Sequence, residues 1–419
     1  MIRRMTIKNF KSLRHVTVEL KPLTIIIGPN ASGKSNLLDA LEGIQRLLQY
    51  KGTTMPGQEG QQPTISLDDV LWRKAEPTEE IDWELHYNLP TDDDEHKPQD
   101  FAKYVNEYSY SIALQRDGLG QDAQAYISRE KLEPLDLDDE SPAKYDYFER
   151  EESAVIVQGA SETVYSEISP TDLALHFYAQ DSFLAVRRLQ RYIQGWGFFK
   201  IIPYLIRSNI IQQRGKSRQL SKYGSNLANV LHYLREDEAD DFEYIQEEML
   251  ATLHFSRLQT REENEGHAKQ VSGGLVYLEA EEKVFPGAKP FGPDNLSDGT
   301  LGLLALLTVL GVSDLAPLIC LEEPERSIHR QLIPSLASYL HDVADQTQLI
   351  VTTHSPEFLD HFDPYQQDYV QVLIAYRDKE GATQFMPIRQ VPDVQEWLED
   401  YMLGQVWTMG QIEEMLEVT

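Results

Sequence analysis

Residues 28–35 read GPNASGKS and fit the phosphate-binding pattern G-x-x-x-x-G-K-[ST] at every fixed position. The apolar run 23–27 before them predicts a buried strand, and residues 36–48 after them predict a helix. In this context the glycines let backbone N–H groups and the helix N-terminus point at one anion. The residues expected to bind nucleotide phosphates are Gly28, Pro29, Asn30, Ala31, Ser32, Gly33, Lys34, Ser35 and Asn36.

Two side chains of this loop have further expected roles. Lys34 can reach the β- and γ-phosphates of a nucleoside triphosphate, and the Ser35 hydroxyl can ligate a magnesium ion. The sequence therefore predicts ATP and Mg²⁺ as cofactors, with Lys34 among the catalytic residues.

A pair of carboxylates follows the apolar run 316–321, which predicts a second buried strand. A buried strand cannot end in Glu322 and Glu323 unless these side chains have partners. A magnesium ion and an attacking water have the right chemistry. We expect Glu322 to hold the metal, directly or through water, and Glu323 to orient or deprotonate the water.

Two further segments complete the motif set. Residues 348–352 predict a core strand that ends near His354, which we expect to sense the γ-phosphate. Ser297 is a good N-cap for a helix over the apolar run 301–310. The N-terminus of that helix suits a phosphate offered by another subunit. The residues expected there are Ser297, Asp298, Gly299 and Thr300.

Together these motifs resemble the ABC-type ATPase heads of the SMC, RecF and OLD group, which are AAA family ATPases. Residues 7–13 (IKNFKSL) resemble that group's N-terminal strand and turn, and residues 296–300 (LSDGT) its signature motif. Residues 322–329 (EEPERSIH) resemble the Walker B and D-loop segment of its short members. The chain is most similar to stand-alone heads of bacterial anti-phage systems, such as Septu and the retron-associated ATPases. The resemblance is firm over residues 1–50 and 290–360.

The resemblance implies an α/β fold, an ABC-type P-loop head with an antiparallel β-subdomain and a compact helical insertion in place of a coiled coil. We expect the N-terminal part of the head over residues 1–165, the helical lid over 166–266 and the C-terminal part over 267–419. Alternating runs between 81 and 165 favour antiparallel strands. The pattern from about 171 to 260 is helical without sustained heptads, and residues 369–388 predict a hairpin.

The resemblance also implies how the motifs would act. Two heads would close on ATP, so that residues 297–300 of one head cap the γ-phosphate bound by the other. We therefore expect a homodimer or higher homo-oligomer. The residues after His354 are too few for the TOPRIM nuclease of OLD proteins. The implied partner is thus a separate effector protein, a nuclease or toxin, held inactive until phage infection.

Composition bounds these expectations. A net charge of −30 and a hydrophobic content of 41% describe an acidic globular chain with ample core. No apolar run approaches the roughly 20 residues that span a bilayer, so we expect a cytoplasmic protein without membrane contact. The single cysteine, Cys320, lies in a predicted core strand and offers neither a disulfide nor a zinc site within the chain.

One basic window stands out in this acidic chain. Residues 187–222 contain nine Lys or Arg residues, no Asp or Glu, and interleaved aromatic side chains. DNA, RNA or an acidic partner protein could bind there, because anionic groups attract such charges. The alternative is a solvated helix pair whose cations face acidic neighbours such as residues 236–248.

The chain departs from the family pattern in three ways. Asp298 and Thr300 replace residues common in transporter signatures, which argues against membrane transport. Glu322 replaces the usual Asp, so metal coordination is expected to be looser. The Q-loop is not placed, with Gln158 and Gln180 as candidates.

Alternative functions remain open at this point. A RecF-like repair or recombination ATPase would act directly on DNA through the basic window. A non-enzymatic scaffold would bind ATP and hardly hydrolyse it. A transporter subunit is the most distant alternative.

Overall fold

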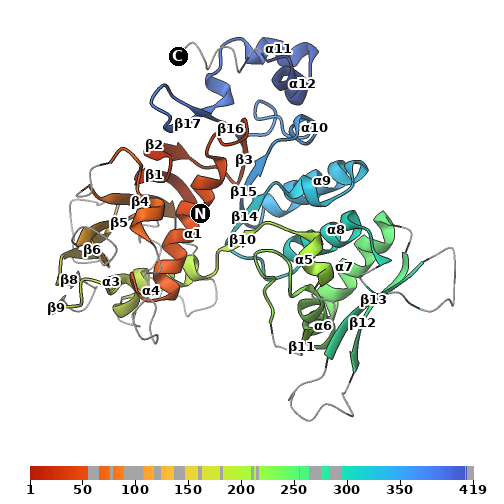
Figure 1. Cartoon of the computed structure of the whole chain (residues 1–419), viewed down its shortest axis with the longest axis horizontal. Helices are drawn as coiled ribbons and strands as arrows, with labels where there is room; N and C mark the ends of the chain where they lie inside the picture. Colours follow the sequence, from red (N-terminus) through yellow and green to blue (C-terminus); the bar gives the residue numbers. More distant parts are fainter. Residues whose placement is uncertain are drawn as a thin grey trace, which may run out of the picture. The chain divides into compact units, whose positions relative to one another are not determined.

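The structure is a computed structural model, shown in Figure 1. The Q-loop candidate Gln180 and two cations of the basic window, Arg214 and Lys216, lie outside the residues that it describes. Every structural statement below refers to the described residues, which are 1–54, 66–75, 79–88, 107–117, 124–135, 147–158, 163–179, 183–208, 212–213, 217–253, 255–263, 275–282, 290, 292, 295–410 and 412.

The chain forms two compact units. Unit 1 contains Met1–Trp196 and Tyr369–Pro392, and unit 2 contains Gly197–Asp368 and Asp393–Glu413. The phosphate loop belongs to unit 1, whereas the signature, Walker B and His354 segments belong to unit 2. Helices of the predicted lid over residues 166–266 occur in both units.

An antiparallel sheet forms one layer of unit 1, with strand order β2-β1-β4-β5-β6-β7-β8-β9 (Figure 1). Side chains of β4 are alternately buried and half-exposed, as expected for a strand with one face on the core. The alternating runs thus correctly predicted antiparallel strands in this region. The bounds are β1 Ile2–Phe10, β2 Leu13–Glu19, β4 Ile81–Asn88, β5 Glu107–Asp117, β6 Gln124–Pro134, β7 Tyr147–Glu151, β8 Ala154–Gln158 and β9 Thr163–Glu167.

The phosphate loop of unit 1 lies between the buried strand β3 (Leu23–Ile27) and helix α1 (Lys34–Gln49). Strand β16 (Val370–Arg377) pairs in parallel with β3 and antiparallel with β17 (Thr383–Pro387). The hairpin predicted over residues 369–388 is therefore present, and one of its strands supports the strand before the loop. The unit's helices besides α1 are α2 Leu67–Val70, α3 Ala174–Phe177, α4 Leu184–Gln194 and the 3-10 turn η6 Ile388–Gln390.

A fully buried ion pair holds one corner of unit 1. Glu130 on β6 and Arg150 on β7 are both 0% exposed, and Arg150 Nη1 lies 3.8 Å from Glu130 Oε2. The Glu130 carboxylate also accepts hydrogen bonds from Ala174 N at 2.7 Å, Leu175 N at 2.9 Å and the Tyr110 hydroxyl at 3.0 Å. These bonds tie the start of α3 to the sheet.

Unit 2 contains three parallel strands in the order β10-β14-β15. Strands β14 and β15 are buried almost throughout and follow the apolar runs that predicted them. Helix α8 precedes β14, and helix α9 connects β14 to β15 (Figure 1). The bounds are β10 Gly197–Phe199, β14 Leu318–Glu322, β15 Gln348–Thr353, α8 Asp298–Leu310 and α9 Ile333–Ala344, with 3-10 turns η4 Pro324–Ser327 and η5 Arg330–Leu332 between β14 and α9.

Helices α5 (Pro203–Ser208), α6 (Leu227–Asp237) and α7 (Ala239–Thr252) of unit 2 lie within residues 166–266, where the helical lid is expected. The helical pattern expected from about 171 to 260 is wrong in part. Strand β12 (Phe255–Glu263) occupies the end of this range and pairs antiparallel with β13 (Leu275–Glu282). Leu258 and Thr260 are buried at alternate positions, which is the period of a strand and not of a helix. The other elements of unit 2 are β11 Gln212–Gln213, α10 Pro356–Leu359, α11 Val394–Asp400 and α12 Leu403–Thr408.

Candidate ATP site

The phosphate loop of unit 1 has the backbone that its glycines predict. Gly33 adopts φ +101°, in the left-handed region, and a Cβ there would lie 2.0 Å from Thr383 Oγ1. Any other residue at this position would be strained and would clash. Lys34 is nearly buried, and its Nζ donates hydrogen bonds to the Gly28 carbonyl at 2.8 Å and the Pro29 carbonyl at 2.9 Å. The loop is therefore closed around its own lysine.

Residues distant in sequence support this loop. Thr383 Oγ1 donates to the Ser32 carbonyl at 2.7 Å and lies 2.6 Å from Ser12 Oγ, which accepts from Asn36 Nδ2 at 2.6 Å. Arg377 Nε donates to the Ala31 carbonyl at 3.0 Å. Sequence reasoning missed Ser12, Thr383 and Arg377 in this role, because single Ser, Thr and Arg residues carry no local signal.

One polar atom of the loop tests whether phosphate fits there. Ser32 is 3% exposed, and its Oγ has no hydrogen-bond partner in the described part of the chain. A buried hydroxyl without a partner is costly, and a phosphate oxygen would satisfy it. The residues of the loop therefore fit the phosphates of a nucleotide, with Ser32, Lys34 and Ser35 as the side chains to hold them.

In unit 2 the structure brings together two residues that the sequence predicted as catalytic. His354 Nε2 lies 2.7 Å from Glu323 Oε1, although the two residues follow different strands. Arg326 Nη1 lies 2.5 Å from the other carboxylate oxygen, Glu323 Oε2. This contact raises the pKa of Arg326 above its ordinary value, because the carboxylate favours the charged guanidinium. Both oxygens of Glu323 are thus held in fixed directions.

The backbone at Glu323 is unusual for a residue with a side chain. Its φ of 47° and ψ of 53° lie in the left-handed region, and its N–H donates to the Thr352 carbonyl at 2.9 Å. Such conformations are costly for residues other than glycine and cluster at functional sites. The turn aims the Glu323 side chain at His354 as the chain leaves β14.

Glu325 contacts the same cluster through hydrogen bonds to Thr353 and His354. Its Oε1 accepts hydrogen bonds from Thr353 Oγ1 at 2.6 Å and from His354 N at 3.3 Å. The side chain is almost wholly buried, and burial raises the pKa of this carboxyl above its ordinary value despite these bonds. Sequence reasoning assigned Glu325 no role.

Glu322, the expected metal ligand, ends β14 and already faces a cation. Lys200 Nζ lies 2.5 Å from Glu322 Oε1. The structure describes no group of three or more His, Cys, Asp or Glu side chains that could hold a metal ion. A single carboxylate such as Glu322 is compatible with Mg²⁺, because that ion uses one or two carboxylates and takes its other ligands from substrate phosphates and water.

The signature segment begins helix α8 as predicted. Ser297 is its N-cap, and the Ser297 hydroxyl accepts a hydrogen bond from Thr300 N at 3.1 Å. Asp298 Oδ1 lies 2.7 Å from Arg207 Nη1, and Arg207 Nη2 donates to the Leu296 carbonyl at 2.8 Å. A Cβ on Gly299 would lie 2.9 Å from His329 N, so only glycine permits this close packing on the segment after Walker B.

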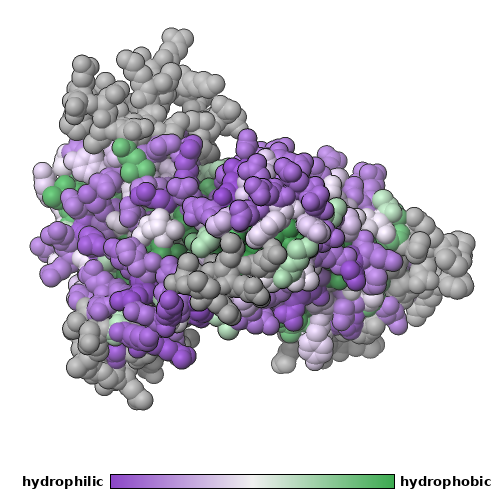
Figure 2. Space-filling model, turned by 90° about the horizontal axis from the view of Figure 1, so that it is seen from above, coloured by the Kyte–Doolittle hydropathy of each residue, from purple (hydrophilic) through white to green (hydrophobic). Residues whose placement is uncertain are grey.

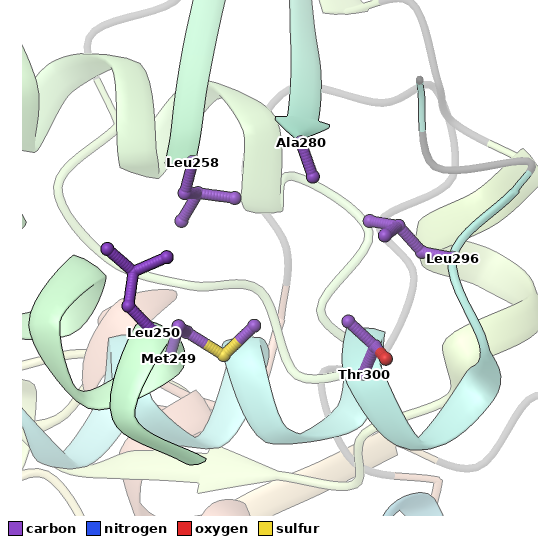
Figure 3. A pocket seen from close by; sticks show the side chains of 6 residues that line it. All are labelled: Met249, Leu250, Leu258, Ala280, Leu296 and Thr300. Atoms are coloured by element: carbon purple, nitrogen blue, oxygen red, sulfur yellow. The ribbon is translucent and has the colours of Figure 1, made fainter. Parts of the chain in front are cut away.

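Apolar side chains also surround the N-terminus of helix α8. Figure 3 shows Leu296 and Thr300 facing a small gap that is also lined by two residues of α7 and two of the β12–β13 hairpin. Thr300 supplies the one polar side chain of the lining, so the gap does not suit a nucleotide. The complete lining is Met249, Leu250, Leu258, Ala280, Leu296 and Thr300.

Among the described residues of the basic window, Lys200, Arg207 and Arg218 form ion pairs. Lys200 pairs with Glu322, Arg207 with Asp298, and Arg218 with both Glu238 and Asp314. Trp196 and Phe198 are buried, whereas Tyr204 is exposed. These contacts favour the interpretation in which the cations face acidic neighbours. Of the two Q-loop candidates, Gln158 ends β8 in unit 1.

Comparison with known proteins agrees with this set of motifs. A family model described as "AAA domain, putative AbiEii toxin, Type IV TA system" matches residues 23–360. The chain belongs to this family. The matched range begins at strand β3 before the phosphate loop and ends after His354, so it includes the phosphate loop, the signature segment, the Walker B segment and His354.

Similar proteins and solved structures indicate the fold of this chain. An OLD nuclease of Thermus scotoductus (strain ATCC 700910 / SA-01) is 25% identical over 395 residues, covering 86% of this chain and 60% of the relative. A crystal structure of an SMC head bound to the C-winged helix domain of ScpA matches with a TM-score of 0.50 and 15% identity, covering 92% of this chain and 98% of that chain. An SMC head domain of Thermotoga maritima matches with a TM-score of 0.44 and 14% identity, covering 92% and 98%. The chain thus has the fold of an SMC-type ATPase head, and it spans about 60% of the length of its OLD relative.

One face of the molecule shows how hydrophilic and hydrophobic side chains are distributed. On the face drawn in Figure 2, hydrophilic side chains predominate and hydrophobic ones form small, separate areas. Within the described ranges, no helix combines the length and the apolar character needed to cross a bilayer.

Proposed function

We propose that the chain binds and hydrolyses ATP, and that the cycle switches the assembly of a homodimer or higher homo-oligomer. The paired contact between Glu323 and His354 carries this proposal, because it unites the two residues expected to handle the attacking water and the γ-phosphate. Membership of an AAA-domain family and the complete phosphate-loop motif support it.

The chain's own residues divide the work of hydrolysis. Lys34 and the backbone of residues 28–33 bind the phosphates. Glu323 orients a water and accepts its proton through Oε1, the oxygen that becomes available when His354 moves away, while Arg326 holds Oε2. His354 donates a hydrogen bond toward the γ-phosphate when it leaves Glu323. A magnesium ion, when bound through Ser35 and Glu322, supplies charge stabilisation on the phosphates.

The oligomeric switch rests on residues 297–300. The N-terminus of α8 suits an anion, and a ligand held by two heads stabilises their closed arrangement until it is cleaved. We propose that this segment of one protomer caps the γ-phosphate bound by another. The assembled form would control a separate effector in anti-phage defence. An effector of the nuclease or toxin class is supported by the names of the OLD relative and of the family.

The first test measures turnover and mass in parallel. Replacing Glu323 with Gln should lower ATP turnover by roughly 10²- to 10⁴-fold, because the water loses its base. Light scattering with ATP and Mg²⁺ should then show a larger mass for Glu323→Gln than without nucleotide, and Ser297→Arg should prevent this increase. Glu396→Gln, an exposed change on α11, serves as the control and should match the wild type in both assays.

The two measurements separate the parts of the proposal. Unchanged turnover in Glu323→Gln would contradict hydrolysis by this residue and favour a scaffold that only binds ATP. If the mass of the wild type and of both variants is the same with and without nucleotide, the proposed switch is contradicted, even if hydrolysis is normal.

A further inference from the structure

We propose that Lys200 is the resident counter-ion of the Walker B carboxylate, and that Mg²⁺ must displace it from Glu322 when nucleotide binds. The inference rests on the proposed function, since it concerns the metal that accompanies ATP. It assigns a charge-neutralising role to one lysine of the basic window.

Strand register places the two side chains together. In the parallel pair β10–β14, Phe199 lies opposite Leu321, so Lys200 and Glu322 are the next residues along each strand. The carboxyl ends of parallel strands lie at the same edge of a sheet, where functional side chains gather. The resulting contact between Lys200 Nζ and Glu322 Oε1 measures 2.5 Å across a sequence separation of 122 residues.

The ammonium group is the movable part of this contact. Lys200 N donates to the Lys222 carbonyl at 2.7 Å, which fixes the backbone of the residue. The Lys200 side chain is 43% exposed, whereas that of Glu322 is 17% exposed. A flexible four-carbon stem with an exposed end can therefore move into solvent while the carboxylate stays in place.

The chemistry of the carboxylate makes the two cations compete. Glu322 Oε1 is an oxygen that Mg²⁺ would use as a ligand, and Lys200 Nζ is within hydrogen-bond distance of it. Lysine neutralises a carboxylate at the end of a buried strand before nucleotide binds. Mg²⁺ can bind Glu322 Oε1 only after Lys200 Nζ has moved away. The free energy of the ion pair is therefore subtracted from the free energy of metal binding.

The test measures the magnesium dependence of nucleotide binding rather than activity. A fluorescent, non-hydrolysable ATP analogue is titrated with Mg²⁺ against wild type, Lys200→Met and Lys200→Arg. Lys200→Met should lower the Mg²⁺ concentration at half-saturation by about two- to fivefold, the range expected for a half-exposed ion pair. Lys200→Arg keeps the competing charge and should remain close to the wild type.

Arg218→Met is the matched control, since Arg218 is 41% exposed and pairs with Glu238 and Asp314 in the same unit. Its magnesium dependence should equal that of the wild type. Thermal unfolding in EDTA gives a second reading: Lys200→Met should have a lower Tm than the wild type, and the gap should narrow with Mg²⁺ and analogue.

Three outcomes would overturn the inference. An unchanged or higher Mg²⁺ requirement in Lys200→Met would show that the lysine does not compete with the metal. Weaker analogue binding by Lys200→Met in EDTA would show instead that Lys200 is a phosphate ligand. Failure of the wild type to bind the analogue at all would overturn the proposed function and this inference with it.

Discussion

Two ion pairs between a glutamate and a cation differ in how far their side chains are exposed to solvent. Glu130 and Arg150 of unit 1 are both 0% exposed, and the carboxylate also receives two backbone N–H groups and a tyrosine hydroxyl. Glu322 and Lys200 of unit 2 meet at the ends of two strands, where the lysine is 43% exposed. The first pair is enclosed by its partners, whereas the second can open.

The difference distinguishes a structural pair from a functional one. A buried charge whose partner is removed is strongly destabilising, so Glu130 and Arg150 cannot separate without loss of the fold. An ion pair with a partly exposed cation is worth less, so Glu322 can exchange Lys200 for another cation at small cost. Burial of the cation, rather than the presence of the pair, indicates which carboxylate is available for chemistry.

The largest expected effect comes from breaking the enclosed pair. Glu130→Ala leaves the Arg150 guanidinium buried without its carboxylate, and it leaves Ala174 N, Leu175 N and the Tyr110 hydroxyl without an acceptor. We expect a loss of about 3–5 kcal/mol in the free energy of unfolding. Urea unfolding followed by circular dichroism measures it.

Glu149→Ala is the matched control for that change. Glu149 is 52% exposed and lies 3.8 Å from Lys131 Nζ, so its removal should alter stability by less than about 1 kcal/mol. Equal losses in the two variants would show that burial does not separate the two classes of ion pair.

The sequence predicts what local patterns encode. The run 316–321 predicts β14 because a buried parallel strand needs continuous apolar residues, and the N-cap at Ser297 is read from the residue type before an apolar helix. The polar partners could not be predicted in the same way. Glu130 and Lys200 find their partners through tertiary packing, and a single charged residue has no periodicity that identifies its partner.

The same limit explains the strand β12. Its alternation of buried Leu258 and Thr260 is short and follows helix α7 directly, so the helical pattern before it extends across the boundary. The left-handed conformation of Glu323 is likewise invisible in the sequence, since the residue type favours a different backbone.

Glu325 is intermediate between the two pairs and gives the next largest effect. It is buried, but its described contacts are the Thr353 hydroxyl and the His354 N–H rather than a cation. Glu325→Ala should cost about 1–3 kcal/mol, because the Thr353 hydroxyl loses a buried acceptor. Glu325→Gln keeps an acceptor oxygen and should recover most of that loss.

Burial also gives Glu325 a pH dependence with a definite sign. Its pKa in the folded state is raised by desolvation, so folding favours the protonated carboxyl. This contribution to stability is complete below the ordinary pKa near 4.5 and is lost as pH rises through the raised value. Between pH 4 and 8, the stability of wild type should therefore fall relative to Glu325→Gln. A constant difference across this range would contradict a raised pKa.

The smallest effect is expected at Arg207, where an exposed pair lies beside the signature motif. Asp298 is 70% exposed and Arg207 27%, so Arg207→Gln should lower stability by at most about 1 kcal/mol. Its effect on assembly should be larger than on folding, because the change leaves the Asp298 carboxylate uncompensated at the helix N-terminus that we propose to face a phosphate. Light scattering with ATP in the Glu323→Gln background should show weaker assembly for Arg207→Gln, and Asp298→Asn should restore it. If Asp298→Asn fails to restore assembly, Arg207 acts through the Leu296 carbonyl that it also holds, and the charge of Asp298 is not what it controls.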